Sequence, residues 1–100
     1  MAVVEVSVVP LGTGSPSVSS HVARALQTLQ GETDIEYQST AMGTIIEGDL
    51  SRVLAAVQKM HETAFNDDVQ RVVTTIRIDD RRDKPLSMQG KLSSLERKLG

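Results

Sequence analysis

Two glutamates and one arginine are the residues whose types and positions carry the most chemistry. Glu5 lies in the segment VVEVSVVP, Glu47 in GTIIEG and Arg77 in RVVTTIRI, and each segment is rich in β-branched residues. A charge inside a strand needs either water or a partner, because burying it alone is costly. Two carboxylates near a guanidinium favour a small polar ligand, and in principle they could act as an acid–base pair.

The length and composition limit what can position these residues. One hundred residues suffice for a single domain with a modest core, and a fold of this size often depends on oligomerisation. The net charge is −2, so bulk attraction to nucleic acid or to an anionic membrane is not implied. The absence of cysteine, of a long apolar run and of a basic leader predicts a soluble, cytoplasmic chain.

Periodicity predicts four strands and three helices. The strands are expected at residues 3–10, 35–42, 44–47 and 71–78. Ser15 before Pro16 is a typical start for a helix that would stop at Gly31, and Asp49 is expected to cap a second helix. A last helix is expected around residues 87–99, with an apolar stripe too narrow to stand alone.

The order βαββαβ with an additional C-terminal helix predicts an α+β, ferredoxin-like antiparallel sheet, formed by residues 1–100 as a single domain. In this arrangement the first and third strands are central, the fourth lies beside the first, and the second lies beside the third. Both main helices cover one face of the sheet. We expect the covered face to carry Val4, Val6, Val8, Ile35, Tyr37, Ile46, Val72, Thr74, Ile76 and Ile78.

The opposite face, here called the open face, would then collect the polar residues. It is expected to hold Glu5, Ser7, Thr40, Glu47, Thr75 and Arg77, with Val3, Val9, Met42, Ile45 and Val73 between them. One interpretation is a solvated surface with a Glu5–Arg77 pair that supports strand register, worth about 0.2–1 kcal/mol. The other is a binding surface for a small, cationic polar ligand, covered by a second copy of the chain, because so many apolar residues seldom stay wet.

Several classes of protein are disfavoured. RNA-recognition domains of this topology need aromatic residues on the strands, and neither Tyr37 nor Phe65 is expected on the open face. No Ser or Thr is tied to a His by a recognisable catalytic motif, and His21 and His61 lie too far apart for a metal-ligand pattern. The glycines near residues 12–14 lack the following Lys of a phosphate-binding loop. No catalytic residue, metal or cofactor is therefore expected.

Three segments resemble a known family. The stretches VSVVPLGT (6–13), MGTIIEG (42–48) and RVVTTIRIDDRRD (71–83) are similar, in the same order, to the small thiamine-binding family with a ferredoxin-like fold, related to YkoF-like domains. The resemblance covers nearly the whole chain. It implies a cytoplasmic, non-catalytic protein that binds thiamine or its pyrimidine part and assembles as dimers paired into tetramers.

The resemblance also suggests roles for the polar residues. Thiamine carries a permanently cationic thiazolium ring and an aminopyrimidine with hydrogen-bond donors and acceptors. Glu47 is the first expected contact and Glu5 the second carboxylate, with Ser7, Thr40 and Thr44 as hydrogen-bonding groups. Including Thr44 assumes that a bend at Gly43 breaks the strand alternation. Arg77 would neutralise Glu5 or meet a phosphate on the ligand.

The leading hypothesis is therefore a non-catalytic, oligomeric protein that binds thiamine or its hydroxymethylpyrimidine moiety, with no nucleic-acid or membrane partner. One alternative is a structural or regulatory module whose open face is simply an interface between copies. Another is an acid–base enzyme that uses Glu5 and Glu47, which predicts turnover of the bound compound.

Overall fold

The computed structural model describes residues 1–12, 19–66, 68–84 and 87–99 of the chain, without the side chains of residues 19–21. The elements in chain order are β1 (Ala2–Leu11), α1 (Ser19–Gln27), β2 (Ile35–Thr40), β3 (Gly43–Gly48), α2 (Leu50–Thr63), β4 (Arg71–Asp80) and α3 (Met88–Leu99). The expected strands and helices are therefore present, and β1 and β4 are both longer than predicted. The predicted helix start at Ser15 and Pro16 lies outside the described residues.

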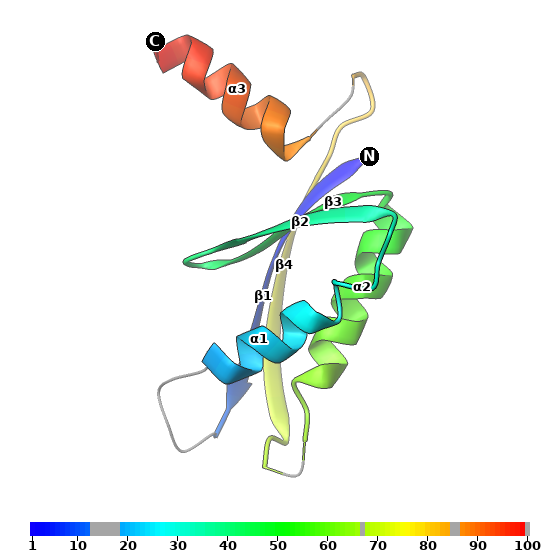
Figure 1. Cartoon of the computed structure of the whole chain (residues 1–100), viewed down its shortest axis with the longest axis vertical. Coiled ribbons are helices and arrows are strands. Elements are labelled where there is room, and N and C mark those ends of the chain that lie inside the picture. The colour runs from blue at the N-terminus through cyan, green and yellow to red at the C-terminus, as the bar shows by residue number, and fades with distance from the viewer. Residues whose placement is uncertain (13–18, 67, 85–86, 100) are drawn as a thin grey trace.

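The sheet has the predicted antiparallel topology. Its strand order is β2-β3-β1-β4, and every neighbouring pair is antiparallel. Helices α1 and α2 lie together on one side of the sheet, while α3 extends from its end (Figure 1). The α+β, ferredoxin-like class with an added C-terminal helix is confirmed.

Two glycines allow β3 to sit in the centre of the sheet. A Cβ atom on Gly43 would lie 2.7 Å from the carbonyl oxygen of Val6, so β1 and β3 could not pair closely there with any other residue. Gly48 has a φ of 155°, and a Cβ there would lie 3.0 Å from Cγ2 of Ile35. The next residue, Asp49, is the N-cap of α2 as predicted, although its side chain accepts from the Ser51 hydroxyl and makes no capping bond.

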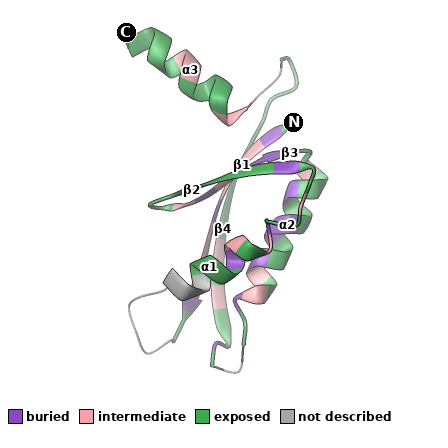
Figure 2. Cartoon of the chain, in the orientation of Figure 1, coloured by how far each residue is buried: buried purple, intermediate pink, exposed green. Residues whose placement is uncertain are grey.

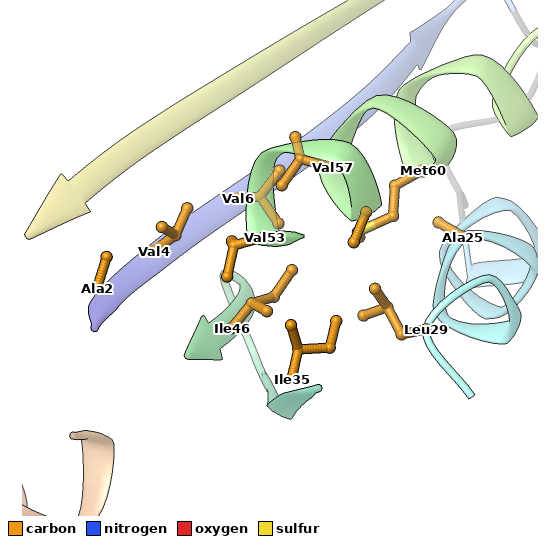
Figure 3. Close-up of a cluster of buried hydrophobic side chains, with 11 residues drawn as sticks. Ala2, Val4, Val6, Ala25, Leu29, Ile35, Ile46, Val53, Val57 and Met60 are labelled. Atoms are coloured by element: carbon orange, nitrogen blue, oxygen red, sulfur yellow. The ribbon is translucent and has the colours of Figure 1, made fainter. Parts of the chain in front are cut away.

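The hydrophobic core lies between the sheet and the pair α1 and α2. Val4, Val6 and Ile46 from the central strands meet Leu29, two residues after the end of α1, and Val53 of α2, and all five are almost completely buried (Figure 3). These strand residues are spaced two apart, which confirms the predicted period-two assignment for β1 and β3. Burial of such side chains contributes about 1.5–3 kcal/mol each.

The predicted burial was wrong for three residues of the two edge strands. Tyr37 on β2 and Ile76 and Ile78 on β4 were expected under the helices, but all three are exposed. The helices cover chiefly the central strands, so these edge-strand residues are left without cover. In the described part of the chain β4 pairs with β1 alone, and Ile76 and Ile78 on it are exposed.

Helix α3 is poorly buried, as is the edge strand β4. None of its residues is buried, and Leu92, Leu95 and Leu99 are all largely exposed. In Figure 2 nearly the whole helix is coloured as exposed, and its C-terminal half stands away from the rest of the protein. Among the described residues, no helix has the length and hydropathy needed to span a membrane.

Candidate functional site

The strand register brings the predicted charged residues to one face. Glu5 of β1 lies opposite Ile45 of β3 and Arg77 of β4, while Glu47 lies opposite Val3, two positions along. Because Val4, Val6 and Ile46 face the core, Glu5, Glu47 and Arg77 all belong to the open face. The prediction that these three residues share one face is confirmed.

Glu5 and Arg77 form the expected cross-strand ion pair. The Arg77 Nη1 atom lies 3.5 Å from Oε1 of Glu5, and both side chains are well exposed. A pair with this exposure contributes only about 0–1 kcal/mol to stability. A ligand could therefore break this ion pair and use either charge with little loss of folding stability.

A hollow of about 500 Å³ lies over this part of the open face, between the sheet and the beginning of α3. Val3 and Ile45 supply apolar surface on the central strands. Glu5, Gln38, Thr40 and Arg77 supply polar groups from the sheet. The volume is within the range of about 300–1,000 Å³ that small-molecule sites occupy.

The other side of the hollow comes from residues that the sequence analysis did not place at the site. Met88, Lys91 and Leu92 of α3 line it together with Ile78 and Asp79 of β4. The Lys91 ammonium pairs with the Asp79 carboxylate, which ties the first turns of α3 to the edge strand. The only sequence signal for these residues was the apolar spacing of Met88 and Leu92, which did not indicate the surface they would face.

Glu47 has a different environment from the one expected. Its side chain is buried, with 8% of its surface exposed, and Oε2 accepts a 2.7 Å hydrogen bond from the backbone N–H of Met88. Met88 is the first residue of α3, whose first N–H groups have no partner within the helix. Glu47 is therefore engaged by α3 and is not among the residues that line the hollow.

A second carboxylate, Glu36 of β2, lies beside Glu47 in the sheet register. A hydrogen bond with the Glu47 carboxyl and the negative charge of Glu47 raise the pKa of Glu36 above its ordinary value of 4.5. Folding therefore disfavours the ionised form of Glu36, the form that a carboxyl takes at neutral pH.

Glu36→Gln is expected to raise the melting temperature at pH 7, because the amide donates to Glu47 and carries no charge. A carboxyl whose pKa is raised by folding lowers stability above that folded pKa, and the penalty disappears below the unfolded value of 4.5. The gain over the wild type should therefore shrink as the pH falls to about 4. Thermal unfolding from pH 4 to pH 8 measures it, with Glu62→Gln on α2 as a control for losing one exposed carboxylate. An equal or lower melting temperature for Glu36→Gln at pH 7 contradicts the pairing.

The three predicted hydroxyl groups are not gathered together. Thr40 lines the hollow, but its Oγ1 already donates to the carbonyl of Gly43 and accepts from the N–H of Met42. Ser7 lies beyond the hollow, opposite Thr75. Thr44 lies opposite Val6 and is buried on the helix side, so the assumption that Gly43 breaks the alternation is wrong.

His61 of α2 has local partners. Nδ1 of His61 lies 2.6 Å from the Thr74 hydroxyl, and the His61 ring meets Phe65 edge-on at 5.3 Å. Both contacts are on the helix side of the sheet. His61 is thus remote from the chemistry of the open face.

The hollow combines an apolar floor with two carboxylates, two cations and one amide. Glu5 and Asp79 can attract a cationic ring, while Gln38 can both donate and accept hydrogen bonds. Arg77 and Lys91 can meet an anionic group at the rim. Such a site suits a small polar compound that carries charged groups of either sign.

Comparison with known proteins gives a consistent result. A family model described as thiamine-binding protein matches residues 4–96. The UPF0045 protein YqgV of Bacillus subtilis is 45% identical over 102 residues, which cover 99% of this chain and 98% of that protein. The family resemblance found in the sequence is confirmed.

Solved structures support the same relationship. The crystal structure of the hypothetical protein MJ1052 of Methanocaldococcus jannaschii has a TM-score of 0.87 at 40% identity and covers 95% of both chains. A Thermotoga maritima structure, described as that of a candidate thiamine biosynthesis/salvage protein, has a TM-score of 0.76. It is 18% identical, covers 94% of this chain and 97% of that one, and therefore supports the fold alone.

Proposed function

Because the chain belongs to the thiamine-binding protein family, we propose that it binds thiamine or its hydroxymethylpyrimidine moiety in the hollow on the open face. The observation that carries this proposal is the position of Glu5, a partly exposed carboxylate between the apolar side chains of Val3 and Ile45. An apolar cleft with a few convergent polar groups is the usual form of a small-molecule site. The proposed location is the cytoplasm.

The charges of the hollow support a cationic ligand. Glu5 can offset the fixed charge of a thiazolium ring, and its pair with Arg77 is long enough at 3.5 Å to be exchanged for a ligand contact. Gln38 can satisfy the aminopyrimidine, which needs both a donor and an acceptor. None of the described residues that line the hollow is aromatic, so apolar contacts with Val3, Ile45 and Leu92 take the place of ring stacking.

Titration calorimetry with thiamine, its phosphates and the free hydroxymethylpyrimidine tests the proposal. We expect saturable binding of at least one of them, at one molecule per chain. Absence of heat with all of them, from protein shown to be folded, contradicts the proposed ligand. The comparison also identifies the preferred form, since Arg77 and Lys91 would strengthen binding of a phosphorylated one.

Binding without catalysis is part of the proposal. Glu47, which an acid–base mechanism would pair with Glu5, is buried against the N–H of Met88 and does not line the hollow. A proton-transferring group must reach the reacting atoms, directly or through one water. Mass analysis of the ligand after prolonged incubation should therefore recover it unchanged, and a new product would favour the enzyme.

A second candidate function, self-association through a structural interface, is favoured by the exposed leucines of α3. Leu92, Leu95 and Leu99 form an uncovered stripe, and β4 offers a free strand edge that carries Val73 and Ile76. Exposed edges and apolar stripes of this kind are normally covered in soluble proteins. We propose that two or four copies associate, which is compatible with ligand binding.

Leu95→Lys is expected to shift the assembly toward a single chain of 10.8 kDa, because it places a charge in the middle of the α3 stripe. Sedimentation velocity at micromolar concentration measures the shift. Gln89→Lys, an equal change of charge at an exposed α3 position, should leave the assembly intact. A wild-type protein that sediments as a single chain contradicts self-association.

A further inference from the structure

We infer that Glu47 controls the binding site from a distance, as the anchor that holds α3 against the open face, and is a positioning residue for the ligand. The effect of Glu47 on ligand binding rests on the proposed function, whereas its anchoring of α3 does not. Glu47 comes from the central strand β3, whereas Met88, the first residue of α3, follows it by 41 residues in the sequence. One hydrogen bond, from the Met88 N–H to Glu47 Oε2, joins the two elements.

The first turn of α3 has a small set of attachments. Ser87 provides the ordinary cap, because its hydroxyl accepts from the N–H of Gly90 at 2.9 Å. The Glu47 carboxylate accepts a hydrogen bond from the backbone N–H of Met88, and the Lys91 ammonium pairs with the Asp79 carboxylate. Further along, no residue of α3 is buried, so packing does little to hold the helix in place.

The burial of Glu47 makes its contact the strongest of these. The carboxylate is 8% exposed, whereas Lys91 and Asp79 are both about half exposed and weakened by solvent. A carboxylate at the start of a helix also interacts favourably with the positive end of the helix dipole. Removing the Glu47 carboxylate would leave the backbone N–H of Met88, the first residue of α3, without its hydrogen-bond partner.

The position of α3 determines the shape of the hollow. Met88, Lys91 and Leu92 line the hollow, and all three lie within the first two turns after the Glu47 contact. If α3 moves away, the hollow loses these three residues and keeps only the sheet side. Loss of Glu47 should therefore weaken ligand binding even though Glu47 does not line the hollow.

Hydrogen exchange and calorimetry on two variants test the inference. Glu47→Gln weakens the anchor, and Ser87→Ala removes the other cap of the same helix end without touching the hollow or the sheet. We expect both variants to speed exchange of the α3 amides, by about tenfold to a hundredfold for Glu47→Gln, the loss of a charge-assisted hydrogen bond. Amides of β1 serve as the reference for the stability of the whole fold.

Calorimetry with thiamine on the two variants shows whether Glu47 positions α3 or contacts the ligand directly. If Glu47 acts through α3, both variants lower the affinity for thiamine, each in proportion to its effect on α3 exchange. Loss of affinity in Glu47→Gln alone, with α3 exchange unchanged, overturns the inference and makes Glu47 a ligand contact. Unchanged exchange of the α3 amides in Glu47→Gln overturns the inference, even if the wild-type protein binds neither thiamine nor its relatives. Faster α3 exchange in a protein that binds none of these compounds rejects the proposed function only.

Discussion

Ile46→Ala is expected to lower the free energy of unfolding by about 2–5 kcal/mol, whereas Ile45→Ala should lower it much less. Ile46 is fully buried between the sheet and helices α1 and α2, so truncation leaves a cavity in the core. Ile45, the preceding residue on β3, points to the open face and is only partly buried. Denaturant unfolding of both variants measures the difference.

The same pair of variants separates stability from binding. Ile45 lines the hollow, so Ile45→Ala should weaken binding of thiamine, measured by calorimetry on the folded variant. Ile46→Ala should leave the affinity of its folded fraction nearly unchanged, because it is on the other side of the sheet. Equal destabilisation by the two substitutions contradicts the assignment of faces.

Glu5→Gln is expected to lower the affinity for thiamine by about tenfold to a hundredfold, the usual effect of losing a charge-assisted contact. The substitution keeps the size of the side chain and removes only the charge that we propose faces the thiazolium ring. Stability should change by about 0.5 kcal/mol or less, since the Glu5–Arg77 pair is exposed. Calorimetry and thermal unfolding give the two quantities.

A matched control is Glu62→Gln, which makes an equal change of charge on the exposed side of α2. It should bind thiamine with wild-type affinity. Wild-type affinity in Glu5→Gln as well would show that the ligand is held without this carboxylate. That result would remove the observation on which the proposed location rests.

Strand periodicity was sufficient to predict the framework of the site. Alternation in β1 and β3 assigned Glu5 and Glu47 to one face, and the predicted strand order put Arg77 beside Glu5. These features are local or follow from connection rules, so one sequence determines them. Thr44 obeys the alternation too, and its assignment to the open face was wrong because it assumed a bend that Gly43 does not make.

The contribution of α3 could not be predicted in the same way. The spacing of Met88, Leu92 and Leu95 indicates a helix with one apolar stripe, but it contains no information about the direction in which the helix leaves β4. That direction depends on long-range contacts, chiefly the Glu47 carboxylate with the Met88 N–H. For this reason the sequence analysis placed Glu47 in the ligand site and omitted Lys91 from it.

The exposure of β4 was missed for a related reason. Alternation predicts which side of the sheet Ile76 and Ile78 occupy, but the extent of helix coverage depends on where α1 and α2 cross the strands. In this fold most of the sheet residues in the core come from β1 and β3. The uncovered isoleucines are the residues that a neighbouring copy would be expected to cover.

The central claim is that the ligand occupies the hollow on the open face, and backbone amide chemical shifts recorded during a thiamine titration test it most directly. The account predicts that the largest shifts occur at Val3, Glu5, Ile45 and Arg77 and in the first two turns of α3, with little change on α2. Shifts confined to the helix side of the sheet, or no shifts at a saturating concentration, would contradict it.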